Sequence, residues 1–199
     1  MFITTRLPYP IIGGDKLRAF HLLKELKKEG NNITLVSLYQ DEKDLAKALD
    51  NHDFYDKLVF VKFNPEFGYV KAIKSILNFE PYTVNYFYEK KMQKLIDKEL
   101  KENNYDLIFC HLVRSAKYAS KYKNITKIID LTDSFSFGYK RRLNVSKNIF
   151  EKIKIKIEHD RMINYEKKII KNFDKSYLIS KFDKEFLSKY ITVNKTNIL

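Results

Sequence analysis

The chain has 199 residues, of which 44% are hydrophobic and 15% aromatic, and its formal net charge is +13. This composition excludes a disordered, collagen-like or coiled-coil chain, and the single cysteine, Cys110, excludes a disulfide-bonded scaffold and indicates a reducing compartment. The sequence has no apolar run of the roughly 18 residues that a membrane-spanning helix needs, and its N-terminal segment lacks a signal-peptide pattern.

The positive charge restricts the expected partners. It favours nucleic acid, an anionic membrane surface or a phosphorylated ligand, with a solvated basic surface as the alternative. We expect a cytoplasmic protein.

Short apolar runs recur along the chain and are typical of β-strands. They are Phe2–Thr5, Ile33–Tyr39, Leu58–Phe63, Asp106–Cys110, Lys127–Leu131 and Lys175–Ile179. Most are continuous runs rather than alternations, which is typical of strands that helices cover on both faces. With helical segments between the strands, the pattern predicts an α/β fold with an open, mostly parallel sheet, right-handed crossovers and helices on both faces.

Two of the intervening segments have the apolar spacing of amphipathic helices. Lys16–Lys28 places Leu and Phe side chains on one face, with Asp15 as the expected N-cap and Gly30 as the stop. Asn85–Glu102 repeats this spacing. Both are expected to cover the sheet.

A basic segment, Gly138–Asn172, contains eleven Lys or Arg residues and four Asp or Glu residues. Its pattern predicts one long helix or two helices in succession. Ile153–Ile157 also allows an edge strand, although the residues on either side are helical in pattern.

Ligands of an open parallel sheet bind beyond the carboxyl ends of its strands, so the residues after each strand are the candidate site. After the first strand, Gly13 and Gly14 precede Asp15, Lys16 and Arg18. Paired glycines at a helix N-terminus allow close approach of an anion, and a tight turn that needs glycine is the alternative. Neither a dinucleotide-binding glycine pattern nor a P-loop is present.

Polar residues follow two later strands. His111, after the fourth strand, is placed to act as an acid or base, and a helix cap or structural group is the alternative. Asp130 and Asp133, around the end of the fifth strand, can bind sugar hydroxyls or a cation, and N-capping is the alternative for Asp133. We expect Arg114 to join them.

The remaining reactive side chains give no second site. His21, His52 and His159 are predicted to lie on the surface, and Cys110 is predicted to be an inert core thiol. No spacing of ligands indicates a metal site, so neither a metal nor a cofactor is expected.

The opening segment, F-I-T-T-R-L-P-Y-P-x-x-G-G-D-K-x-R-x-x-x-L-L-K-x-L, is similar to the start of retaining GT-B glycosyltransferases of the family-four type. The similarity is greatest to the sugar transferases of bacterial exopolysaccharide loci. Tyr105–His111, Ile128–Ser134 and Tyr165–Ser180 fit the same order, so the resemblance covers essentially the whole chain.

This resemblance implies that residues 1–199 form one Rossmann-like, acceptor-binding N-terminal domain, and that the donor-binding C-terminal domain is absent. The full-length enzyme would transfer a sugar, with retention, from a UDP- or GDP-linked donor. The acceptor would be lipid-linked or a polysaccharide, in surface-polysaccharide synthesis. We expect the chain alone to be inactive.

The resemblance also implies roles for single residues. His111 matches a histidine near the reacting sugar and is the expected catalytic residue. The residues expected on the donor-phosphate side of the cleft are Gly13, Gly14, Asp15, Lys16, Arg18 and Ser180. Those expected on the acceptor side are Arg114, Asp130 and Asp133.

Basic and apolar residues alternate in the basic segment. The basic ones are Lys140, Arg141, Arg142, Lys147, Lys152, Lys154 and Lys156, and the apolar ones are Ile149, Phe150, Ile153 and Ile157. Such a helix predicts peripheral docking on an anionic membrane, here the inner face of the plasma membrane, where lipid-linked acceptors would be reached. The alternative is that the isoleucines pack on the sheet, and both hold if isoleucine faces inward and lysine outward.

Two other function classes remain as alternatives. One is a basic nucleic-acid-binding module, although the sequence has no helix-turn-helix, zinc-finger, RNP or KH signature. The other is a stand-alone nucleotide-binding protein of Rossmann type.

Overall fold

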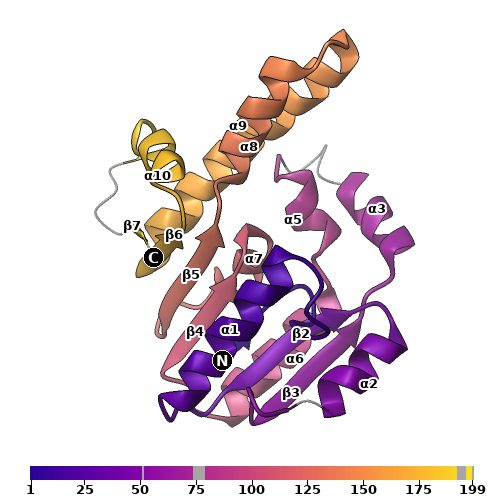
Figure 1. Cartoon of the computed structure of the whole chain (residues 1–199), viewed down its shortest axis with the longest axis vertical. Helices are drawn as coiled ribbons and strands as arrows, with labels where there is room; N and C mark the ends of the chain where they lie inside the picture. Colours follow the sequence, from indigo (N-terminus) through magenta and orange to yellow (C-terminus); the bar gives the residue numbers. More distant parts are fainter. Residues whose placement is uncertain (51, 74–78, 192–195, 199) are drawn as a thin grey trace.

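The computed structural model describes residues 1–50, 52–73, 79–191 and 196–198, and its strands form one sheet in the order β3-β2-β1-β4-β5-β6-β7 (Figure 1). The strands are β1 (Phe2–Ile3), β2 (Thr34–Tyr39), β3 (Lys57–Lys62), β4 (Leu107–His111), β5 (Thr126–Thr132), β6 (Lys175–Leu178) and β7 (Thr196–Ile198). Each pair of neighbours is parallel. The strand order reverses between β1 and β4, as in Rossmann-like folds, so the predicted α/β class is confirmed. The sequence patterns did not predict β7.

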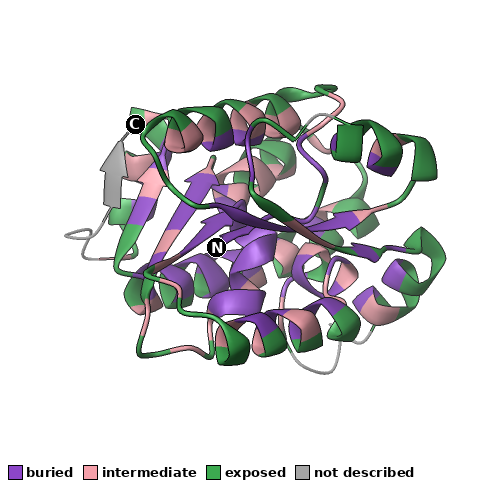
Figure 2. Cartoon of the chain, turned by 90° about the horizontal axis from the view of Figure 1, so that it is seen from below, coloured by how far each residue is buried: buried purple, intermediate pink, exposed green. Residues whose placement is uncertain are grey.

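Helices cover both faces of the sheet (Figure 2). They are α1 (Gly14–Lys28), α2 (Glu42–Asp50), α3 (Pro65–Ile73), α5 (Tyr82–Tyr86), α6 (Lys90–Glu102), α7 (Ala116–Ala119), α8 (Phe135–Val145), α9 (Ile149–Asn172) and α10 (Lys181–Ser188), with a 3-10 turn at Val113–Ser115. Alternate side chains of the strands point to opposite faces, which divides the core in two. Figure 2 shows the buried strands between the two helical layers.

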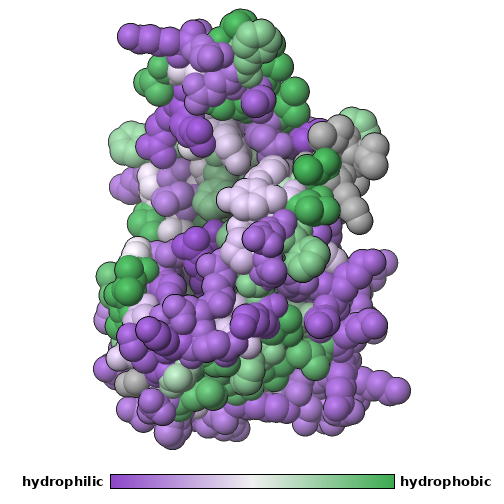
Figure 3. Space-filling view, turned by 90° about the vertical axis from the view of Figure 1, so that its right-hand side faces the viewer, coloured by the Kyte–Doolittle hydropathy of each residue, from purple (hydrophilic) through white to green (hydrophobic). Residues whose placement is uncertain are grey.

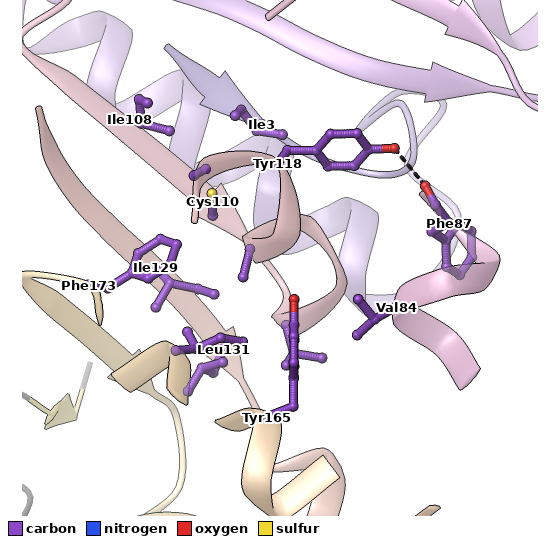
Figure 4. Packing of buried hydrophobic residues seen from close by; sticks show 14 of the residues in the cluster. Ile3, Val84, Phe87, Ile108, Cys110, Tyr118, Ile129, Leu131, Tyr165 and Phe173 are labelled. Atoms are coloured by element: carbon purple, nitrogen blue, oxygen red, sulfur yellow. Dashed lines mark hydrogen bonds between the residues drawn. The ribbon is translucent and has the colours of Figure 1, made fainter. Parts of the chain in front are cut away.

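The larger part of the core lies between the sheet and helices α6, α7 and α9 (Figure 4). Ile3, Cys110 and Ile129 contribute from adjacent strands, and Tyr118 of α7 donates a hydrogen bond from its hydroxyl to the carbonyl of Phe87 at 2.7 Å. The smaller part packs α1 against the opposite face. This second packing fixes the N-terminal end of α1 beside the ends of β4 and β5.

Two helix predictions need correction. Gly13, with φ of 97°, is the N-cap of α1, while Asp15 lies in the first turn and accepts a hydrogen bond from the Lys16 backbone N–H. Asn85–Glu102 is not one helix, because α5 ends at Tyr86 and α6 begins at Lys90. Gly30, with φ of 81°, follows the end of α1 as predicted.

The basic segment forms two helices in succession, α8 and α9, which pack on each other and project from the sheet (Figure 1). The edge-strand alternative for Ile153–Ile157 is therefore wrong. The expectation that the isoleucines face inward is also wrong, since the side chains of Ile149, Phe150, Ile153 and Ile157 are 46% to 73% exposed. The stretch 149–157 of α9 extends past the sheet beside α8, and Ile155 is the buried residue of that stretch.

Of the three histidines predicted to lie on the surface, His21 and His52 are exposed. His159 is buried instead, because α10 places the ring of Phe186 against it, at 6.3 Å between centroids. Cys110 lies in the core, where burial raises its pKa to about 12, as expected for an inert thiol.

Candidate functional site

The backbone adopts left-handed conformations in the loops at the carboxyl ends of three adjacent strands. Gly13 lies in the loop after β1, while Leu112 (φ 67°) follows β4 and Thr132 (φ 66°) ends β5. For residues other than glycine this conformation costs about 1–2 kcal/mol, and such strain is concentrated at functional sites. Neither Leu112 nor Thr132 carries a sequence signal for it, so sequence reasoning missed both.

The carboxylate of Asp130 lies at the centre of this edge and is fully buried. Arg18 of α1 binds it through both ends of its guanidinium, with Nε 2.7 Å from Oδ2 and Nη2 3.1 Å from Oδ1. His111 places Nδ1 3.1 Å from Oδ2. Burial acts to raise the pKa of Asp130, but the hydrogen bonds from His111 and Arg18 outweigh it and hold that pKa below its ordinary value.

His111 joins this carboxylate to the first turn of α1. Its Nε2 lies 3.0 Å from the backbone carbonyl oxygen of Asp15, and its side chain is only 1% exposed. Both ring nitrogens therefore face oxygen atoms, which fixes the orientation of the ring. The histidine predicted to be catalytic is held in place between β5 and α1.

A second carboxylate, that of Asp15, binds two more arginines at the carboxyl ends of these strands. Arg114 donates from Nη2 at 3.0 Å and Arg6 from Nη1 at 3.4 Å. Burial acts to raise the pKa of Asp15, and the charges of Arg114 and Arg6 outweigh it, so the pKa is lowered. Burial and the nearby Arg6 lower the pKa of Arg114 to about 10, and its guanidinium lies 4.4 Å from the centre of the Phe87 ring.

A pocket of about 710 Å³ opens beside these residues. Its polar lining includes Gly14, Asp15, Arg18, Arg114, Thr132 and Asp133. Its apolar lining is made of Leu17, Leu22, Leu112, Phe135 and Ile179. A pocket with apolar walls and a few convergent charged groups is the usual form of a small-molecule site.

Asp133 contributes an exposed carboxyl group to this pocket. Ser134, rather than Asp133, is the N-cap of α8, so the capping alternative for Asp133 is wrong. Among the described residues no hydrogen bond or ion pair reaches the Asp133 side chain, and burial together with the charge of Asp183 raises its pKa. It is the carboxyl group of the pocket that is left free to bind a ligand.

Two predicted site residues lie apart from the others. Lys16 points its ammonium at Asp44 of α2, 3.4 Å away, although its neighbours line the pocket. Ser180 is the N-cap of α10 and accepts a hydrogen bond from the backbone N–H of Phe182 at 3.1 Å. Ser180 therefore has a capping contact in this structure.

A buried glutamate of α9 holds the start of α8. Glu166 accepts hydrogen bonds from the backbone N–H groups of Phe135 (2.7 Å) and Ser136 (3.3 Å), and from the hydroxyls of Ser134 and Ser136. Burial raises its pKa to about 7, against the effect of these hydrogen bonds. Sequence reasoning missed this cluster, because its members are about 30 residues apart and no local spacing joins them.

No group of three His, Cys, Asp or Glu side chains in the described part of the chain could hold a metal ion. The described helices also include none that is long and apolar enough to cross a membrane. A scan of protein-family models and a search of curated proteins found no match to this chain. The class that the fold defines is that of Rossmann-like α/β proteins with an open parallel sheet.

Proposed function

We propose that this chain is the acceptor-binding domain of a retaining GT-B glycosyltransferase and works with a domain that binds the nucleotide-sugar donor. The observation that carries the proposal is the direct contact among Arg18, His111 and Asp130. These residues come from three separate stretches that resemble the family, and their side chains meet beside one pocket at the carboxyl edge of the sheet.

The pocket offers the charges that such a transfer needs. Arg18 lies beside the N-terminal turn of α1, whose backbone N–H groups favour an anion, here the donor diphosphate. Arg114 lies on the expected acceptor side and holds Asp15 of that turn. Asp133 would accept a hydrogen bond from an acceptor hydroxyl. His111 would act by fixing Asp130 and α1, so that the protein's part in the reaction is positioning and charge stabilisation.

The proposal includes peripheral docking on the inner face of the plasma membrane. The hairpin of α8 and α9 ends in exposed apolar side chains, which we call the hairpin tip (Val145, Ile149 and Phe150). Apolar and hydrophilic surface alternate at this uppermost end of the molecule in Figure 3. Lysines and arginines that flank the tip would each contribute about 1 kcal/mol near an anionic surface.

The test is a calorimetric titration of the whole chain with a prenyl-diphosphate-linked monosaccharide in detergent micelles, and separately with UDP- and GDP-sugars. We expect the acceptor to bind, and Asp133→Asn to weaken it about tenfold through loss of a charged hydrogen bond. Asp106→Asn is the matched control, because Asp106 is also exposed but lies at the amino end of β4.

A folded chain that binds no acceptor would contradict the proposal. Salt-dependent binding to duplex DNA in its place would support the nucleic-acid alternative, because phosphate contacts release counterions.

A further inference from the structure

Helix α3 presents its largest apolar side chains to solvent. Phe67, Tyr69, Val70 and Ile73 of α3, with Phe79 after it, are 56% to 78% exposed, and we call these five residues the α3 face. The buried residues of the helix are Gly68 and Ala72. A surface helix of a globular protein normally has the opposite arrangement, and a contiguous exposed apolar patch marks an interaction site.

Close packing explains why the small residues face inward. A Cβ atom at Gly68 would lie 2.8 Å from the Phe63 ring and 2.9 Å from the Tyr86 ring. The side of the helix that carries Gly68 is therefore packed tightly against Phe63, which follows β3, and Tyr86 of α5. Rotation to bury Phe67 or Val70 would force these bulkier side chains into the same space.

Helix α3 is connected to the hairpin through α5. Helices α3 and α5 pack together, and the backbone N–H of Tyr82 at the start of α5 donates to Glu158 of α9 at 2.8 Å. Figure 1 shows α3 and α5 beside the hairpin, and the side of the molecule that carries α3 faces the viewer in Figure 3, where apolar surface is visible below the hairpin end.

We propose that the α3 face enters the apolar layer of an anionic bilayer and is a second membrane contact besides the hairpin tip. This inference rests on the membrane part of the proposed function. Its basis is that a strongly basic chain carries two exposed apolar elements linked through α5, and that the basic segment between residues 138 and 172 has eleven cations against four anions. Two contacts would fix the tilt of the protein on the membrane, which one hairpin would leave free.

The chain has no tryptophan, so one introduced tryptophan reports on its own surroundings. Three single variants serve the test: Phe67→Trp in the α3 face, Phe150→Trp in the hairpin tip, and Leu49→Trp as control. Leu49 is also exposed, but α2 lies at the far end of the molecule from the hairpin (Figure 1). Each is mixed with vesicles of phosphatidylglycerol and phosphatidylcholine, with and without brominated acyl chains that quench tryptophan.

We expect a blue shift and quenching for the tryptophans at positions 67 and 150, and neither for position 49. We also expect the double variant Phe67→Ser/Val70→Ser to lower the vesicle partition coefficient at least tenfold, whereas Leu49→Ser leaves it unchanged. Both sets of residues are exposed, so the fold is retained and far-ultraviolet circular dichroism checks this.

Quenching at position 150 without quenching at position 67 would overturn the second contact and leave the hairpin contact standing. Quenching at neither position would overturn both. A blue shift at position 67 that depends on protein concentration and not on vesicles would show that a second copy of the chain covers the α3 face, and would also overturn the inference.

Discussion

Charged side chains are paired and largely buried at the carboxyl edge of the sheet, whereas those of the α8–α9 hairpin are exposed. At the edge, Arg18 binds the buried carboxylate of Asp130 and Arg114 binds Asp15, so the cations are compensated inside the protein. At the hairpin, the ion pair of Arg142 with Glu151 is long, 3.9 Å, and both side chains are exposed. The edge contacts hold strands and helices together, whereas the hairpin charges remain available to a partner.

The largest expected effect is that of removing a cation from the edge. Arg18→Met leaves the buried carboxylate of Asp130 without its bidentate partner and should lower the free energy of unfolding by about 3–5 kcal/mol. Arg142→Met, on the hairpin, should change it by less than about 0.5 kcal/mol. Urea unfolding followed by circular dichroism measures both. If both variants lowered the free energy of unfolding by the same amount, the charges of the two regions would not differ in their contribution to stability.

The next effect concerns the pH dependence of stability and depends on Glu166. Its pKa is about 7 in the folded chain against an ordinary value of 4.5, so the folded state keeps a proton that the unfolded state releases between these values. The free energy of unfolding should therefore fall by about 3 kcal/mol as the pH rises from 4.5 to 7, and then level off. Thermal unfolding across this range measures it.

Glu166→Gln is the control for that pH dependence, because an amide of the same shape does not titrate. Its profile should lack this fall, and an unchanged slope would assign the effect to another group. Asp130 and Asp15 act in a separate window, since their lowered pKa values contribute stability that is lost only as the pH falls below about 3.8.

A smaller effect distinguishes the two adjacent glycines of the edge. Gly13→Ala places a Cβ atom on a residue with φ of 97° and 3.3 Å from Asp15 Oδ1, so we expect a loss of about 1–2 kcal/mol. Gly14 is helical and a Cβ atom there meets nothing within 4 Å, so Gly14→Ala should be neutral or stabilising. Comparison of the two urea midpoints checks this, and equal midpoints would show that Gly13 is not needed for its conformation.

The smallest expected effect on stability is that of the hairpin tip. Ile149→Ser and Phe150→Ser each remove an exposed side chain and should change the free energy of unfolding by less than about 0.5 kcal/mol. The same changes should weaken sedimentation with anionic vesicles, because they remove apolar contact at the tip. A large loss of stability would mean that the tip packs on another part of the protein.

These differences also explain what the sequence could and could not predict. The positions of β1 to β6 could be predicted, because continuous runs of Val, Ile, Leu and Phe are typical of strands covered on both faces. The exposure of Ile153 and Ile157 could not, because a period of 3.6 residues identifies an apolar stripe and not the neighbour that covers it. Ile155, between them, is buried.

For the candidate site, sequence reasoning selected most of the residues and missed their contacts. Arg18, His111 and Asp130 could be selected because they lie near or after the carboxyl ends of strands, and parallel strands end at one edge. The bidentate pair of Arg18 with Asp130 depends on the rotation of α1 over the sheet, which its packing against the strands sets. Arg6 and Glu166 needed the same three-dimensional information.

The most direct test of the separate roles of the pocket and the hairpin is to measure acceptor binding in two environments. The whole chain, Asp133→Asn and Phe150→Ser would each be titrated with a prenyl-diphosphate-linked monosaccharide, once in neutral detergent micelles and once in anionic vesicles. We expect Asp133→Asn to weaken binding in both, and Phe150→Ser to weaken it only in vesicles. If Asp133→Asn bound the acceptor as tightly as the unchanged chain in both environments, the pocket at the carboxyl edge would not be the acceptor site.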